Sequence, residues 1–427
     1  MAEAAFDGTQ QMQFGQAEAY RSVQDINACR VVPPVRLAFY FYAVTIPFET
    51  VDLGIPFLEL TMISFFILVG SLLFQPDLAF RRPPAAFWLF VIYVIVFAIP
   101  TLLGDVPVQE ESDWQLKVLI HLVILAWVSF NIMKNHEVAR NGLIIFAAAC
   151  GLLAVMQITG LSSMSAEYES MTDRSTSFGF HPNNLARILA LGMLAVVGLA
   201  YGTRRGLTHL KMAVPLVILI IGYAIIQTGS RGGLLALFAG LMVIVLGDGS
   251  ARSRSRNIAL VGAAVLLIGA LMLTSEVTSS RFERAMDDGD LARRELIYPI
   301  SWEMFLERPI VGWGGKSSEY ELGARLGHPE EETKNPHNLY LYLLVATGLV
   351  GAVPMLAGLG LTFRAAWSTR TGPLGVVPLS MFVTVMVANI SGLWQHNKMH
   401  WFVIALALST VSVVRVARPG PEFNRPI

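Results

Sequence analysis

Long apolar runs separated by short polar breaks dominate the chain from residue 36 to residue 416. A helix needs about 20 apolar residues to cross the hydrocarbon core of a bilayer. By hydropathy, the runs predict about twelve membrane-spanning helices. The predicted spans are 36–52, 56–74, 86–104, 114–133, 141–160, 183–203, 211–228, 232–248, 257–275, 337–363, 373–392 and 399–416. The pattern therefore predicts an all-α, polytopic membrane protein.

The composition agrees with this fold class. The 427 residues are 54% hydrophobic and only 15% charged, which is unusual for a soluble domain. The net charge is zero, so no basic patch suggests nucleic-acid binding. The two cysteines, Cys29 and Cys150, offer neither a disulfide framework nor a metal site.

The distribution of Lys and Arg among the short loops predicts the orientation, because cytoplasmic loops carry the excess. One set of loops holds Arg81, Arg82, Lys134, Arg140, Arg204, Arg205, Lys211, Arg252, Arg254, Arg256, Arg364 and Arg370. The opposite short loops hold only Arg174, Arg231 and Lys398. We therefore expect the first set to be cytoplasmic, with both termini inside.

This orientation divides the chain into five parts. They are a cytoplasmic tail at 1–35, transmembrane helices one to nine at 36–275, a periplasmic loop at 276–336, helices ten to twelve at 337–416, and a cytoplasmic tail at 417–427. Residues 1–35 lack an apolar signal core, so we expect the first span itself to direct insertion.

The long loop contains a helical pattern of its own. Its apolar positions are Leu296, Ile297, Ile300, Met304 and Phe305, and its charged positions include Arg293, Arg294, Glu295, Glu303 and Glu307. This spacing predicts an amphipathic helix that lies on the membrane or covers a cavity. Pro299 should kink or restart that helix. The nearby Asp287, Asp288 and Asp290 are not spaced as in an EF-hand, which argues against calcium.

Three polar clusters begin apolar runs and are predicted to open on the same outer face. They are FHPNNLAR at 180–187, TGSRGG at 228–233 and NPHNLY at 335–340. A membrane protein has little reason to gather strong polar groups there unless they act on a ligand. We therefore place the candidate chemistry at these clusters.

Arg231 lies in a glycine-rich turn with Ser230 and Gly232. The helix that follows presents the positive end of its dipole, so a cation there is misplaced unless an anion joins it. Glycine permits close approach, and an arginine fork suits phosphate oxygens. The alternative is an arginine that snorkels to lipid headgroups. This motif alone favours neither that role nor anion binding.

Arg187 lies one turn into the sixth predicted span, 183–203, after Asn183 and Asn184, which can cap that helix. A buried arginine is costly unless it is paired or near water. It is a second candidate for an anion, and a structural ion pair is the alternative. Its candidate partners are Glu49, Asp52 and Glu59.

His337 and Asn338 open the tenth predicted span. Histidine is the usual general base near neutral pH, although a lone histidine is more often a helix-start residue. His181 has the same ambiguity and a weaker claim. His396 and His400 belong to a separate turn, in which Trp394 and Trp401 are expected to be interfacial anchors.

Taken together, arginines for phosphate and a histidine base favour group transfer from a membrane-borne phosphate ester. The sequence shows no nucleotide-binding loop, no metal-ligand spacing and no Ser-His-Asp order. We therefore expect an enzyme without a cofactor or metal that uses an activated, lipid-linked donor.

Three stretches carry a family resemblance, namely TGSRGGLLAL, ERPIVGWG at 307–314 and PHNLYLYLLVATGLVG at 336–351. They resemble the O-antigen ligase and O-antigen polymerase family of bacterial envelope assembly, over about residues 175–365. The resemblance implies a GT-C-type glycosyltransferase of the inner membrane. It would take a glycan from undecaprenyl diphosphate at the periplasmic face, without a metal. Ligases pass the glycan to lipid A–core, and polymerases pass it to another lipid-linked repeat unit.

The resemblance also implies roles for particular residues. His337 would be the catalytic base, and Arg231 would bind diphosphate. Arg187 is a weaker match, and either Arg281 or Arg284 could be the loop arginine. We rank an inverting ligase first and a repeat-unit polymerase second. A transporter is third, because the polar groups gather at helix ends and no repeat is evident.

Overall fold

The computed structural model describes residues 30–51, 59–103, 109–161, 178–202, 208–247, 294–327 and 333–416, with isolated positions between 255 and 269. No strand element occurs among them, and α-helices dominate. The helices are α2 (Pro33–Thr45), α3 (Leu60–Ser71), α4 (Ala85–Leu103), α5 (Gln109–Met133), α6 (His136–Ile158), α8 (Pro182–Tyr201), α9 (Thr208–Gln227), α10 (Arg231–Leu246), α13 (Arg294–Glu307), α14 (Gly315–Arg325), α15 (Leu339–Ser368), α16 (Val377–Ala388) and α17 (Lys398–Val416).

Each predicted span except 257–275 coincides with a helix, and that one falls largely outside the described residues. Five helices in the described part are long and apolar enough to cross a membrane: 110–133, 136–158, 182–201, 209–227 and 339–368. Shorter apolar helices occur at 60–74, 85–100, 231–246 and 377–388. In the described part of the chain, the predicted helical fold with several helices long and apolar enough to cross a membrane is therefore confirmed, while the number twelve and the GT-C fold stay predictions.

Helix α8 forms the centre of one half of the bundle. Every residue from Leu185 to Ala200 is buried, as expected for a helix that is apolar on all sides. Small residues let its neighbours approach closely. A Cβ on Gly198 would lie 2.6 Å from the Val377 side chain of α16, and one on Gly233 of α10 would lie 2.6 Å from Ala186. These contacts bring the starts of α8 and α10 together.

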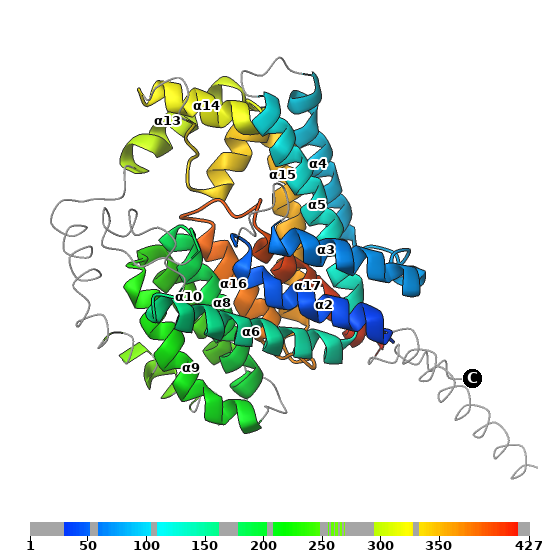
Figure 1. The fold of residues 1–427 in the computed structure, drawn as a ribbon. Helices are drawn as coiled ribbons and strands as arrows, with labels where there is room; N and C mark the ends of the chain where they lie inside the picture. Colours follow the sequence, from blue (N-terminus) through cyan, green and yellow to red (C-terminus); the bar gives the residue numbers. More distant parts are fainter. Residues whose placement is uncertain are drawn as a thin grey trace, which may run out of the picture.

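A second group of helices lies beside this one (Figure 1). It contains α4, α5, α15 and α17, and α16 packs against both groups. Helices α13 and α14 lie together at one end of the bundle, where α14 contacts α4, α5 and α15. The long loop therefore contributes helices that cover one end of the membrane-crossing bundle.

Helix α15 is broken at Gly348, so the predicted single span 337–363 is wrong in this respect. Gly348 has φ 55° and ψ −163°, which no helix adopts. On one side of the break, the backbone N–H groups of Trp313 and Gly314 donate to the carbonyls of Val345 (2.9 Å) and Ala346 (2.8 Å). On the other side, N–H groups at Leu349 and Val350 donate to the carbonyls of Pro309 (2.8 Å) and Ile310 (3.1 Å).

The ERPIVGWG segment thus supplies backbone partners to both halves of the break. An apolar environment requires this, because backbone groups freed by a broken helix must find partners within the protein. Glycine is needed at Gly312 because a Cβ there would lie 2.6 Å from the Ala346 backbone. A Cβ on Gly348 would likewise collide with the Ile310 carbonyl. The two motifs are therefore one structural unit.

The amphipathic pattern in the long loop is confirmed as helix α13. Ile297, Met304 and Phe305 are buried against Leu322 of α14 and Val345 of α15. The helix covers the first segment of α15, while Leu296 is exposed. Pro299 lies inside α13, so of the two predicted effects, a kink or a restart of the helix, the restart does not occur.

Candidate functional site

The three polar clusters do not lie apart in the structure. The starts of α8 and α10, the first described residue of α13 and the turn after α16 meet around the buried guanidinium group of Arg187. The charges of Arg187 and Arg294 also act on His337, just before α15.

Arg187 is 2% exposed and binds the turn after α16. Its Nη2 donates to both the backbone carbonyl and the hydroxyl of Ser391, each at 2.8 Å. Its Nη1 donates to Asn184 Oδ1 at 3.4 Å, and its guanidinium carbon lies 5.6 Å from the Trp394 ring centre. None of these partners is a carboxylate, so the described residues do not support the alternative of a structural ion pair.

The two described carboxylates proposed as ion-pair partners are used elsewhere. Glu49 accepts a hydrogen bond from Asn397, and Glu59 forms an ion pair with Lys398 at 3.0 Å. Asp52 lies outside the described residues. Arg187 is therefore a buried cation whose described partners are all uncharged.

Arg294 joins Arg187 at Ser391. Its Nη2 donates to the same backbone carbonyl at 3.3 Å. From the sequence alone, Arg294 was predicted to lie on the polar face of an amphipathic helix and was not predicted as a site residue. Its neighbour Arg293 and its own charge were the only signals, and both fitted the polar face of the helix equally well.

Each of the two guanidinium groups has one N–H donor without an acceptor among the described residues. The Nε atoms of Arg187 and Arg294 are buried and have no hydrogen-bond partner among the described residues. A buried N–H without an acceptor is costly, and two adjacent cations repel each other. An anion with several oxygen acceptors would remove both penalties.

Glycines give this cation pair its space. A Cβ on Gly392 would collide with the Arg187 guanidinium, and one on Gly232 would lie 2.5 Å from Ser391 Oγ and 3.7 Å from Arg187 Nη2. Gly232 follows Arg231, the half-buried first residue of α10. The TGSRGG motif therefore borders Arg187, and its own arginine lies one residue from that contact.

His337 lies just before α15 in a strained backbone conformation. Its φ is 50°, unusual for a residue other than glycine and worth about 1–3 kcal/mol of strain. Its N–H donates to Asn335 Oδ1 at 2.9 Å. Asn338 caps the following helix by accepting from the N–H of Leu341 at 3.2 Å. Such strain persists only where the surroundings hold it.

The electrostatic surroundings of His337 favour a neutral imidazole. The residue is exposed on one side, but partial burial is the largest cause that lowers its pKa below the usual 6.5. The charges of Arg294, Arg187 and Lys334 lower the pKa further. His337 thus lies near the arginine pair and is free to accept a proton at neutral pH.

Two other predicted site residues are helix caps. The Nδ1 atom of His181 accepts from the N–H of Asn183 at 3.2 Å, so this nitrogen carries no proton in that contact. Ser230 Oγ accepts from the N–H of Gly233 at 3.1 Å. Both side chains fix the start of a helix that borders the arginines. Arg281 and Arg284 lie outside the described residues.

The expectation for Trp394 and Trp401 is wrong. Both are buried, at 1% and 0% exposure, instead of lying at a lipid interface. Trp394 Nε1 donates to Asn184 Oδ1 at 2.9 Å, and Trp401 Nε1 donates to the Gln395 carbonyl at 2.7 Å. They secure the turn that carries Ser391. A tryptophan N–H can be satisfied at a lipid interface or by an acceptor inside the protein, so the sequence alone could not distinguish these two locations.

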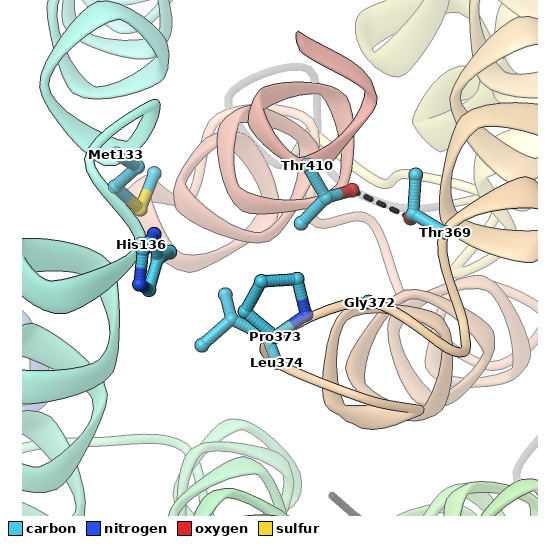
Figure 2. A pocket seen from close by; sticks show the side chains of 7 residues that line it. All are labelled: Met133, His136, Thr369, Gly372, Pro373, Leu374 and Thr410. Atoms are coloured by element: carbon cyan, nitrogen blue, oxygen red, sulfur yellow. Dashed lines mark hydrogen bonds between the residues drawn. The ribbon is translucent and has the colours of Figure 1, made fainter. Parts of the chain in front are cut away.

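A separate hollow lies at the opposite end of α15. Figure 2 shows it between the end of α5, the start of α6, the turn after α15 and the end of α17. Thr369 and Thr410 share a hydrogen bond of 2.7 Å there. The lining includes His136 but no arginine. Helix α15 runs from the arginine site to this hollow, so the two are unrelated.

Residues 216–356 match the family described as O-antigen ligase. The chain is 29% identical to an O-antigen ligase of Pseudomonas aeruginosa over 245 residues, which cover 55% of this chain and 56% of the relative. It is 24% identical over 270 residues to the teichuronic acid biosynthesis protein TuaE of Bacillus subtilis, covering 58% and 54%. The chain thus spans just over half the length of these curated relatives.

Proposed function

We propose that the chain is a membrane glycosyltransferase of the GT-C type that acts like an O-antigen ligase, because residues 216–356 match the family described as O-antigen ligase. It would move a glycan from undecaprenyl diphosphate to lipid A–core or a similar acceptor at the periplasmic face of the inner membrane. The observation that carries this proposal is a pair of arginines, Arg187 buried and Arg294 half-buried, whose Nε donors are buried and unsatisfied and whose charges act on His337.

The arginines suit a diphosphate leaving group. Negative charge grows on the bridging oxygen as the bond to the sugar breaks, and fixed cations in a poorly hydrated site stabilise that charge. Arg187 and Arg294 share an anchor at Ser391, and Arg231 borders the same site. A diphosphate offers enough oxygens for all three. The reaction then needs no metal.

His337 suits the role of general base. Its neutral imidazole would take the proton from an acceptor hydroxyl as that oxygen attacks the anomeric carbon of the donor sugar. The bond from that carbon to the diphosphate oxygen breaks, polyprenyl diphosphate leaves, and the anomeric configuration inverts. Base assistance of this kind is typically worth about 10²–10⁴ in rate.

A repeat-unit polymerase is the second candidate. One matched relative is named for O-antigen and the other for teichuronic acid, which supports keeping a second acceptor open for this chain. The arginine pair and His337 would act alike in both reactions. The difference lies in whether lipid A–core or a second lipid-linked glycan presents the hydroxyl.

Reconstitution in vesicles tests the proposal. We expect the protein to transfer glycan from a polyprenyl-diphosphate donor to lipid A–core, and to keep this activity in the presence of a chelator. Elongation of the donor glycan without lipid A–core would identify a polymerase instead. Consumption of donor only after a metal is added would contradict the proposed mechanism.

A further inference from the structure

Lys316 on α14 lies at a junction of three segments. Its ammonium group is 2.7 Å from Glu111 of α5 and 3.1 Å from Glu319 on its own helix. It also donates to the hydroxyl of Thr333 at 3.1 Å. A lysine ammonium has three protons, and here three acceptors match them. Lys316 is therefore committed to structural contacts.

The charge of Lys316 is kept in spite of its partial burial. Burial alone would lower its pKa, but the hydrogen bonds and charges of Glu111 and Glu319 raise it above the usual value. Glu319 is itself buried and is further held by a hydrogen bond from Gln115 of α5 at 3.4 Å. The junction thus fixes α14 to the end of α5.

The third contact leads towards His337. Thr333 lies four residues before it, and the N–H of the next residue, Lys334, donates to the Glu319 carbonyl at 2.9 Å. The segment from Thr333 to Asn338, which lies between α14 and α15, forms a linker. At its far end it is fixed by the Asn338 cap and by a hydrogen bond from the N–H of Leu339 to the Asn389 carbonyl at 2.9 Å. The strained His337 lies between these two attachments.

We propose that Lys316 and Thr333 are positioning residues that hold the His337 imidazole in its working place. The inference rests on the proposed function, because it assumes that His337 is the base. A strained backbone persists only when its surroundings over-determine it. Loss of the attachment at Thr333 would let the linker relax, and displacement of a reacting group by about 1 Å can cost about a hundredfold in rate.

Thr333 offers a matched pair of variants. Thr333→Val keeps the shape but removes the acceptor for Lys316, whereas Thr333→Ser keeps a hydroxyl. We expect Thr333→Val to lower the kcat for glycan transfer about tenfold, with an unchanged KM for the donor because the arginine pair is untouched. Thr333→Ser should stay within about twofold of wild type. Thr333→Ser should melt at the same temperature as wild type, whereas Thr333→Val should melt slightly lower because the Lys316 ammonium group loses one of its three acceptors.

A second arm separates positioning from general damage. When one residue acts through another, the effects of substituting the two residues do not add. In a His337→Ala background, Thr333→Val should therefore cause no further loss of transfer. An equal loss in both backgrounds, or a normal kcat for Thr333→Val, would overturn the inference. If Thr333→Val does not fold, Thr333→Ala takes its place with the same expected results.

The same assay distinguishes failure of the underlying function. Normal transfer by His337→Ala would remove the base assignment, and no transfer by the wild-type protein would remove the proposed function. A transfer defect in His337→Ala together with a normal Thr333→Val enzyme would reject only the positioning role.

Discussion

The imidazole of His337 must be neutral to accept a proton from a hydroxyl. Partial burial and the charges of Arg294, Arg187 and Lys334 lower its pKa, so the free protein should have the base ready below pH 6.5. Bound diphosphate would act in the opposite direction, because its negative charge favours the protonated ring.

These opposing effects give a pH prediction. As pH rises, kcat/KM should increase along an acid limb whose midpoint lies below 6.5, the ordinary histidine value. The acid limb of kcat, which reports the donor-bound enzyme, should lie at higher pH. Lys334→Gln should move the kcat/KM limb upward, since one cation that lowers the pKa is removed. Coincident limbs that do not respond to Lys334→Gln would exclude His337 as the titrating group.

The Gly392 position tests the arginine site at the same scale. Gly392→Ala would place a methyl group on the Arg187 guanidinium, which Ser391 and Asn184 hold in place. We expect the KM for donor to rise about tenfold or more, because misplacing one charged hydrogen-bonding group is worth about 1.5–3 kcal/mol. Gly360→Ala is the control, since a Cβ there meets nothing within 4 Å. Equal KM values for the two variants would contradict the arrangement.

Among the structural elements, the break in α15 has the clearest physical requirement. Gly348→Ala should destabilise the protein by about 1–3 kcal/mol through its positive φ, and by a further amount of about 1–3 kcal/mol through overpacking against Ile310. Gly327 also has a positive φ, of 73°, but open space around a Cβ, so Gly327→Ala should cost only the first amount. Thermal melts in detergent compare them, and equal melting temperatures would show that contact with the ERPIVGWG segment is unimportant.

Hydropathy located the helices because apolar length is what a membrane-crossing helix requires. It could not locate the break at Gly348, since the apolar run continues on both sides of it and the neighbouring Thr347 is a single uncharged residue of a kind that helices tolerate. The convergence of helix starts was predictable from misplaced cations. Ser391 was not, because its main contribution is a backbone carbonyl that every residue has. Arg294 was not predicted as a site residue, because the polar face of an amphipathic helix already accounted for its charge.

At the scale of the whole molecule, the orientation in the membrane follows from the loop charges and is testable with single cysteines. Ser318 is a poor labelling position because it is buried, whereas Ala324 on the same helix is exposed. In a background without Cys29 and Cys150, Ala324→Cys should react with an impermeant maleimide in intact spheroplasts. Thr371→Cys, in the turn after α15, should react only after lysis. The reverse pattern would invert the predicted topology.

The central claim is that donor binding and proton removal are performed by different groups in one site. The most direct measurement compares donor binding with single-turnover transfer for two variants. Arg187→Lys keeps a charge but loses the fork that binds two oxygens, so it should bind donor poorly. His337→Ala should bind donor nearly as wild type does and transfer glycan about 10²–10⁴ times more slowly. A folded His337→Ala protein with normal transfer, or one that loses binding and transfer together, would contradict the account.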